Sequence, residues 1–354
     1  MISLCILTKN SEKMIAQCIN SAKGISGEVI VVDTGSSDRT KEIVRELGAK
    51  VYDYKWDDNF SNAKNFLKSK ATKDWILLLD QDETISSQDF DKIKKLAKDE
   101  KYLGYFLIQR NYVKGIGHVG LVSCKDDKYE ESKDFEGYVP RKMLRLFKND
   151  SRARFTGAVH ESVIQSIEKI GIGLIGNSDI AIHHYGLLDR GADRNRRYVD
   201  IEKKNIRNDF YQEYQIAIQL HSIGEVKEAS EHLLKSIELN PNFNLSYLEV
   251  AIIMMKIGKV SEAKPFLLHS IKLKENETAW SHLGIVEVYE KNFDKAIECF
   301  KKAISMNEKN ADFYFNLAQV LKQSGNIEEA KKEFKRAVYL NAVYEGKRKE
   351  FESS

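Results

Sequence analysis

The chain has 354 residues, of which 42% are hydrophobic and 31% are charged. This length is enough for two or three domains with a sizeable core, and the composition is ordinary for a soluble globular protein. The 56 basic and 53 acidic side chains nearly cancel, leaving a formal charge of +3, so neither nucleic acid nor an anionic membrane is expected as the main partner.

Cysteine usage and the first residues bear on where the protein works. The four cysteines lie far apart, at positions 5, 18, 124 and 299, and no C-x-x-C pair occurs. Such spacing is typical of reduced thiols in a cytosolic protein. Residues 1–8 lack a basic start and run into Lys9, which favours a strand over a signal peptide. No apolar run approaches the length of a membrane span. We therefore expect a soluble, cytoplasmic protein.

The first third of the chain alternates short apolar runs with helical patterns. Strand patterns cover 2–7, 28–33 and 50–54, and helical patterns between them end at Ala22 and Leu47. This order is typical of a parallel sheet with right-handed crossovers. The sequence contains no glycine-rich dinucleotide motif and no P-loop.

The most informative strand of this half runs directly into acidic residues. Trp75 and the apolar residues 76–79 predict a strand buried on both faces. Asp80, Asp82 and Glu83 follow it. A divalent cation that carries a diphosphate needs hard oxygen ligands held rigidly at the end of a strand. The sequence therefore predicts a cation site at this position.

Other polar residues fall at predicted strand ends. Thr8 follows the first strand, Asp33 ends the second, and Asp80 to Asp82 follow the buried one. In parallel sheets ligands bind at the carboxyl ends of the strands. Asp33 has two interpretations of equal weight, as a ligand contact or as the residue that caps its own Asp-Thr-Gly-Ser-Ser turn.

Four motifs occur in a characteristic order in this half. They are Ile-Leu-Thr-Lys-Asn-Ser-Glu from residue 6, Val-Val-Asp-Thr-Gly-Ser-Ser-Asp-Arg-Thr from residue 31, Trp-Asp-Asp-Asn-Phe-Ser-Asn-Ala-Lys-Asn from residue 56, and Leu-Asp-Gln-Asp-Glu from residue 79. Together they resemble the family 2 glycosyltransferases of the GT-A fold, and the resemblance extends to about residue 200.

The resemblance implies a set of residues around a nucleoside-diphosphate sugar. Those beside the nucleotide would be Thr8, Glu12, Asp33, Asn62, Lys64, Asn65 and Asp80. Asp33 would accept an N–H of uracil or another base, and Asp80 would approach the ribose or the metal. Lys64 stands where the family usually has arginine, and lysine lacks the planar fork for a bidentate contact.

The resemblance also implies a metal. Asp82, with Asp80, would ligate Mn²⁺ or Mg²⁺ bridging the diphosphate, and His184 of the Ile-His-His-Tyr-Gly stretch would complete the metal or diphosphate shell. Imidazole is an acceptable ligand for Mn²⁺. His183 and His184 point to opposite faces of a strand, so only one of them is expected to serve. A histidine of the core is the alternative interpretation.

Between these motifs the sequence is less decisive. A helix is predicted over 89–98 and strands over 105–110 and 141–147. The polar segment 114–139 is either a mobile acceptor loop or an insertion. Arg145 lies on the second of these strands, where it contacts a phosphate or simply belongs to an exposed edge strand.

The segment Phe-Thr-Gly-Ala-Val-His-Glu over 155–161 is a second candidate site. Similar segments occur in glycosyltransferases that carry tetratricopeptide repeats, including the bacterial peptide S-glycosyltransferases of bacteriocin pathways. An inverting transfer needs a group that takes the proton of the acceptor nucleophile, and Glu161 or His160 would supply it. A buried His–Glu pair that braces the sheet is the alternative.

Beyond Tyr211 the chain repeats with a period of about 34 residues, the tetratricopeptide length. Copies of a G-x-[VI]-x-E-A marker begin at Gly224, Gly258 and Gly325, and a looser copy begins at Lys291. One copy cannot bury its apolar face alone, so the copies are expected to stack into an all-α superhelix with a concave surface.

The sequence thus predicts a GT-A domain over 1–205, with a mostly parallel sheet flanked by helices, a repeat domain over 206–345 and a charged tail over 346–354. The predicted function is metal-dependent, inverting transfer of a sugar, with a UDP-sugar as expected donor, to a Ser/Thr hydroxyl or Cys thiol of a peptide or protein. The repeats would hold that acceptor and are compatible with a homodimer. The alternatives are a glycan acceptor, with the repeats serving assembly, and a non-catalytic adaptor.

Overall fold

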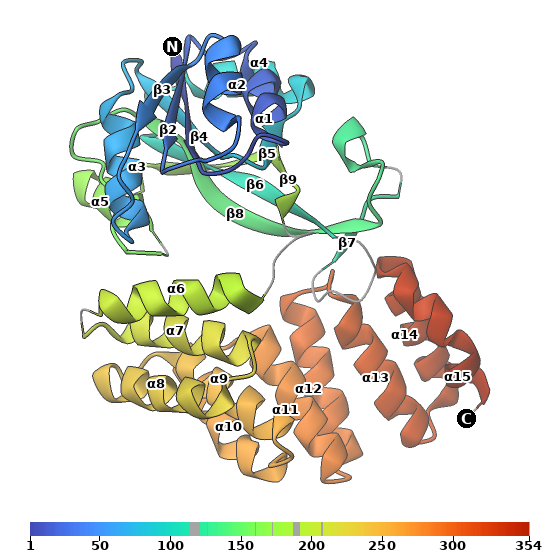
Figure 1. The fold of residues 1–354 in the computed structure, drawn as a ribbon. Coiled ribbons are helices and arrows are strands. Elements are labelled where there is room, and N and C mark those ends of the chain that lie inside the picture. The colour runs from blue at the N-terminus through green and yellow to red at the C-terminus, as the bar shows by residue number, and fades with distance from the viewer. Residues whose placement is uncertain are drawn as a thin grey trace. The chain divides into compact units, whose positions relative to one another are not determined.

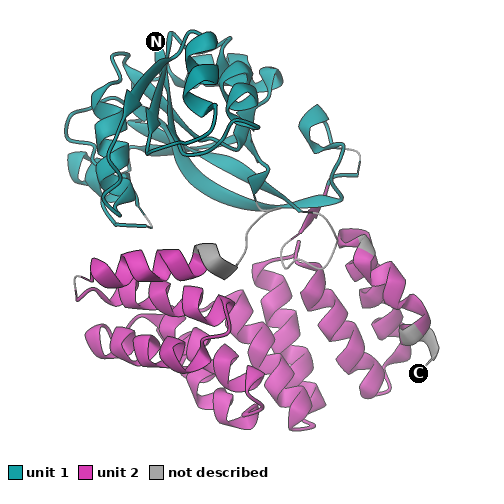
Figure 2. Cartoon of the chain, viewed as in Figure 1, with its two compact units in different colours: residues 1–114, 124–190 teal, residues 115–123, 191–354 magenta. Residues whose placement is uncertain are grey.

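A computed structural model of the chain describes residues 1–113, 121–125, 127–159, 161–171, 173–186, 192–206 and 208–353. The chain forms two compact units (Figure 2), one of residues 1–114 and 124–190, the other of residues 115–123 and 191–354. Helix α6 (Ala192–Lys204), which the sequence places in the first domain, belongs to the second unit. Its Val199 is buried against Ile216 and Leu220 of the following helix.

The first unit is built on one mixed sheet with the order β3-β2-β1-β4-β8-β6-β9-β5 (Figure 1). The strands in this order are β1 (Ile2–Thr8), β2 (Glu28–Asp33), β3 (Lys50–Asp53), β4 (Trp75–Asp80), β5 (Glu83–Ile85), β6 (Gly104–Val113), β8 (Gly137–Lys148) and β9 (Ile175–His184). The two-residue strand β7 (Val122–Ser123) is not part of this order, and its residues belong to the second unit. Strands β1 to β4 pair in parallel, as the sequence predicts. Strand β8 is antiparallel to both β4 and β6. The GT-A expectation for this half is confirmed.

Helices cover both faces of this sheet. They are α1 (Ile15–Ala22), α2 (Thr40–Glu46), α3 (Phe60–Ser69), α4 (Phe90–Leu96) and α5 (Ile164–Ile170). Leu77 of β4 faces a core that includes residues of α1, α2 and α4, and Ile76 faces one that includes residues of α3 and α5. Both side chains are almost fully buried. The prediction of a strand buried on both faces is therefore confirmed.

The position of β8 corrects one interpretation of Arg145. This strand lies inside the sheet, between β4 and β6, and the Arg145 side chain is buried. An exposed edge strand therefore does not explain the basic residue. Its antiparallel pairing with β4 brings Arg145 near the acidic end of that strand.

From residue 192 onward, the described part of the second unit consists of helices and the turns between them. Beyond α6 it contains α7 (Phe210–Ser222), α8 (Val226–Leu239), α9 (Asn244–Lys256), α10 (Lys264–Leu273), α11 (Glu277–Tyr289), α12 (Phe293–Met306), α13 (Ala311–Gln323), α14 (Ile327–Leu340) and α15 (Arg348–Ser353). The last of these lies within the predicted tail, where Phe351 stacks on Phe334 with ring centroids 4.2 Å apart.

The repeat markers have a clear structural reason. Gly224, Gly258 and Gly325 have φ between 84° and 85°, the left-handed region in which glycine meets no steric cost. Lys291 occupies the same place with φ 64°, so it adopts the glycine conformation at some cost in strain. The alanine that ends each marker is buried where paired helices meet. The predicted tetratricopeptide organisation is confirmed.

Two further observations bear on the expected environment. All four cysteines are buried and unpaired, and burial raises the pKa of each thiol, to about 11 for Cys124 and Cys299. No helix in the described part of the chain is both long enough and apolar enough to cross a membrane.

Candidate active site

The predicted strand ends meet at one edge of the sheet. Thr8 is in register with Asp33 on β2, and Leu7 is in register with Asp80 on β4. The Thr8 hydroxyl donates to Gln81 Oε1 over 2.7 Å, and the Lys9 N–H donates to the same oxygen over 2.9 Å. These bonds tie the end of β1 to the acidic turn that follows β4.

Asp33 is fully buried and serves its own turn. Its Oδ1 accepts from the N–H groups of Gly35 (2.9 Å) and Ser36 (2.8 Å), and its Oδ2 accepts from the Ser36 hydroxyl. The structure thus realises the turn interpretation of this residue. Glu12 is exposed and accepts from the Arg39 N–H, which links the loop after β1 to the one after β2.

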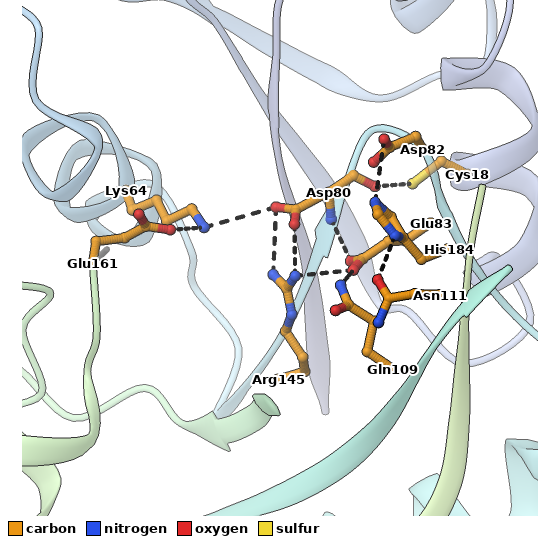
Figure 3. Close-up of polar contacts among 10 residues, drawn as sticks. All are labelled: Cys18, Lys64, Asp80, Asp82, Glu83, Gln109, Asn111, Arg145, Glu161 and His184. Atoms are coloured by element: carbon orange, nitrogen blue, oxygen red, sulfur yellow. Dashed lines mark hydrogen bonds and ion pairs between the residues drawn. The ribbon is translucent and has the colours of Figure 1, made fainter. Parts of the chain in front are cut away.

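Helix α3 directs only one of its three predicted contacts toward the acids. The Asn62 amide donates to Asp57, in the loop that precedes the helix. Asn65 binds both the N–H and the C=O of Phe155, at 2.9 and 3.0 Å. It therefore holds the segment that leads to Glu161 against the helix. Lys64 alone points toward the acids (Figure 3).

Arg145 joins two acids of the Leu-Asp-Gln-Asp-Glu motif. Its Nη2 lies 2.6 Å from Asp80 Oδ2 and 2.9 Å from Glu83 Oε1. Glu83 is fully buried, and its other oxygen accepts from the Asp80 N–H over 2.7 Å. The side-chain amide of Gln109 on β6 donates to the first oxygen. Arg145 is thus a bridge between carboxylates here.

Lys64 forms a second bridge. Its ammonium lies 2.5 Å from Glu161 Oε1 and 3.7 Å from Asp80 Oδ1. The Lys64 side chain is only 8% exposed and that of Glu161 14%. Glu161, Lys64, Asp80, Arg145 and Glu83 therefore form a line of alternating charge along the strand ends (Figure 3).

The two cations set the protonation of these acids. Burial of Asp80 opposes ionisation, but Arg145 and Lys64 hold its pKa well below the usual range. Burial raises the pKa of Glu83, although Arg145 opposes the shift. Burial alone would lower the pKa of Lys64, and the carboxylates of Glu161 and Asp80 raise it instead. Lys64 and Arg145 are therefore cations, and Asp80 is an anion.

Asp82 and His184 form a separate pair of possible ligands. His184 Nε2 lies 3.4 Å from Asp82 Oδ2. The other ring nitrogen, Nδ1, lies 2.8 Å from Asn111 Oδ1. In the neutral tautomer whose Nδ1–H donates a hydrogen bond to that amide oxygen, Nε2 carries a lone pair toward the carboxylate. Two acceptors facing one another at this distance fit a bound cation.

Position 186, beside this pair, has room for glycine but not for a larger residue. A Cβ on Gly186 would lie 1.7 Å from Asp82 Oδ2 and 3.1 Å from His184 Nε2. In the described part of the chain, no three His, Cys, Asp or Glu side chains gather closely enough to hold a metal alone. A cation here would therefore take its remaining ligands from phosphate oxygens and water, as Mg²⁺ often does.

Replacing Gly186 with alanine should displace the Asp82 carboxylate and weaken Mn²⁺ binding by at least about tenfold, the usual scale for disturbing the support of a metal ligand. Titration of the protein with Mn²⁺, followed by calorimetry, measures the effect. Gly27→Ala is the control, because its Cβ would meet nothing closer than 3.5 Å. Equal Mn²⁺ affinities for the two variants would count against a cation at Asp82 and His184.

Some residues of the site could not be predicted from the sequence, and some predicted residues lie outside the site. Gln109 and Asn111 carry no motif, and the one available signal is that they share a strand face. Gly186 belongs to the Ile-His-His-Tyr-Gly stretch, but its contact with Asp82 is not apparent from the sequence. His183 turns away from the acids, and its Nδ1 lies 2.7 Å from the Tyr112 hydroxyl. His160 lies outside the described residues.

Part of the segment 114–139 can also be placed. Residues 114–120 and 126 lie outside the described residues. In the remainder, the Tyr129 hydroxyl donates to buried Asp89 over 2.9 Å, and Arg110 pairs with Asp127 over 2.6 Å. Asp127 and Tyr129 therefore tie their segment to β6 and to the turn before α4.

The chain matches two known families. Residues 3–157 match the glycosyl transferase family 2, and residues 288–342 match a tetratricopeptide repeat family. The first match includes Lys64, Asp80, Asp82 and Arg145. Glu161 and His184 lie beyond its end.

Three relatives are similar over part of their length. A TPR repeat-containing protein of Synechococcus elongatus is 28% identical over 67% of this chain and 56% of its own length. The SPbeta prophage-derived glycosyltransferase SunS of Bacillus subtilis is 26% identical over 69% of this chain and 54% of its own length. An uncharacterized glycosyltransferase of Rickettsia typhi is 42% identical over 29% of this chain and 36% of its own length. The chain thus spans about half the length of the first two.

Proposed function

We propose that this chain, in which a family 2 glycosyltransferase domain precedes tetratricopeptide repeats, is a metal-dependent inverting glycosyltransferase. It moves a sugar from a nucleoside-diphosphate sugar, a UDP-sugar in our proposal, to a peptide or protein side chain. The observation that carries the proposal is the line of charges at the strand ends with the facing acceptors Asp82 and His184 beside it. Four of these residues, Lys64, Asp80, Asp82 and Glu83, lie in the motifs that resemble the family.

The charges at the site favour a cation as part of the donor complex. Four carboxylates, those of Asp80, Asp82, Glu83 and Glu161, stand against two cations, Lys64 and Arg145. A donor diphosphate would add further negative charge. Like charges held close together in a partly buried site repel one another strongly. A divalent cation on Asp82 and His184 would offset this excess and stabilise the charge that develops on the departing diphosphate.

The chain's own residues supply the remaining roles. Lys64 and Arg145 place positive charge beside the diphosphate, and Asp82 with His184 holds the cation. Glu161 takes the proton of the acceptor hydroxyl or thiol while that atom attacks the anomeric carbon from the side opposite the diphosphate. Attack from that side inverts the configuration at the carbon.

The repeats support a polypeptide acceptor. Stacked repeats of this kind give an extended surface along which a chain can lie, and pairs such as His221–Glu249, at 2.5 Å, link α7 to α9 in the second unit. We also propose a cytoplasmic location, because four buried, unpaired thiols suit a reducing compartment.

A thermal-shift series against nucleoside-diphosphate sugars, with and without Mn²⁺, tests the proposal. A true donor binds only the native state and should raise the melting temperature. We expect the rise for one UDP-sugar in the presence of Mn²⁺, and its loss on addition of EDTA. A folded protein that no nucleotide sugar stabilises, with or without metal, would contradict the proposed function.

A further inference from the structure

Lys64 occupies an unusual position between two carboxylates. Its ammonium is 2.5 Å from Glu161 and 3.7 Å from Asp80. Of the two, Asp80 already has a strong partner, because the Arg145 guanidinium contacts both of its oxygens, at 2.6 and 3.4 Å. Glu161 depends on Lys64 more heavily than Asp80 does.

The backbones around this pair are tied together, and Lys64 reaches Glu161 through a four-carbon stem. Helix α3 begins with the Asn59 side chain accepting from the Asn62 N–H over 3.0 Å. The Ser61 hydroxyl donates to Gly157 C=O over 2.6 Å, and the Phe60 N–H donates to Ala158 C=O over 2.8 Å. The helix and the segment leading to Glu161 are thus tied together. A four-carbon side chain on such a helix can redirect its ammonium without moving the backbone.

The ion pair occupies the carboxylate of Glu161. Its Oε1 lies 2.5 Å from the Lys64 ammonium, so that oxygen is not free to receive an acceptor proton while the pair persists. Protonation of Glu161 would also leave the buried Lys64 without its nearest counter-charge, which is costly. The arrangement on its own therefore opposes the proton transfer that the proposed reaction needs.

A donor diphosphate would remove this obstacle. Its oxygens carry more charge than Glu161, and they would lie beside Asp80, on the other side of the ammonium. We propose that Lys64 is an exchangeable counterion, which pairs with Glu161 when the donor is absent and turns to the diphosphate when the donor binds. Glu161 thereby becomes an effective base only once the donor is in place. This inference rests on the proposed function.

Because of this exchange, sugar transfer takes place only when the donor is bound. The acceptor oxygen or sulfur forms a bond to the anomeric carbon as the bond from that carbon to the diphosphate oxygen breaks. The acceptor proton moves to Glu161, and the electron pair of the broken bond leaves with the diphosphate, beside Lys64. Without the donor, the Glu161 carboxylate stays paired with the Lys64 ammonium.

Binding of diphosphate ligands to charge variants tests the exchange. The probes are inorganic pyrophosphate and UDP, each with Mn²⁺, followed by calorimetry. Glu161→Gln should bind both probes about tenfold tighter than the wild type, because Lys64 no longer has to leave a carboxylate. Glu161→Asp has a shorter side chain, so its carboxylate lies farther from the Lys64 ammonium. It should bind the probes more tightly than the wild type by a smaller factor, and it replaces Glu161→Gln in the test if that variant is unstable.

The decisive comparison is made in a second background. In Lys64→Met the gain from Glu161→Gln should disappear, whereas a direct repulsion between Glu161 and the diphosphate would persist there. Lys64→Arg should keep the gain. Lys68→Met, one turn along the same helix and bonded to Asp150 C=O, should match the wild type.

Two outcomes overturn the inference in distinguishable ways. If the wild type binds UDP and Glu161→Gln binds it no tighter, Lys64 does not exchange and the proposed function stands. If the wild type binds neither probe at any Mn²⁺ concentration, the proposed function fails and the exchange fails with it.

Discussion

Replacing Asp82 with asparagine should lower the rate of sugar transfer by about a thousandfold. A cation at a departing diphosphate contributes several kcal/mol to transition-state stabilisation, and each ~1.4 kcal/mol is a factor of ten in rate. Asparagine keeps the size of the side chain but loses the charge that a hard cation prefers. The Asp82 side chain is 24% exposed, so the fold should tolerate the change. Initial rates measured over a Mn²⁺ titration would show the loss.

A matched change elsewhere separates this effect from a general loss of charge. Asp53→Asn alters an acid at the end of β3 that is 73% exposed and pairs with Lys41. It should retain the wild-type rate and melting temperature. Full activity in Asp82→Asn would place any required cation away from this residue.

Replacing Arg145 with methionine should destabilise the first unit by about 3–5 kcal/mol, the usual cost of removing one partner from a buried ion pair. The guanidinium is almost fully buried and is the cation that contacts Glu83, which is itself fully buried. Without it, Glu83 must be protonated or remain charged without a counterion. Urea unfolding followed by circular dichroism would measure the change.

A second replacement in the same cluster shows whether charge is the cause. Glu83→Gln in the Arg145→Met background removes the unpaired acid and should recover part of the lost stability. Arg152→Met, at a residue that is 65% exposed beside Asp150, should change the free energy of unfolding by less than about 0.5 kcal/mol. If Arg145→Met were equally harmless, the ion pairs would not stabilise the unit.

Much of the fold follows from short-range patterns. The β-branched runs, the apolar residues 76–79 and the repeated glycine turns each indicate one element, and parallel pairing then places Thr8, Asp33 and Asp80 at one edge. Antiparallel insertion of β8 is harder to foresee, because its partners β4 and β6 are distant in sequence. That insertion is what buries Arg145.

The ion-pair partners of the charged residues cannot be predicted from the sequence, for the same reason. A motif shows which side chains stand at a strand end, but not which cation reaches them. Asp80 meets Arg145 across 65 positions, and Lys64 meets Glu161 across 97. Asn65 resembles a nucleotide contact in sequence, yet it binds the backbone of Phe155 because the two segments pack together.

The four buried thiols have a consequence for the handling of a thiol acceptor. Disulfide exchange requires a thiolate that can reach its partner, and here burial keeps Cys5, Cys18, Cys124 and Cys299 protonated and inaccessible. A cysteine-containing peptide could therefore meet this protein without forming a mixed disulfide. In assays with such peptides, the reductant is therefore needed to keep the peptide thiols reduced, and not to protect the cysteines of this chain.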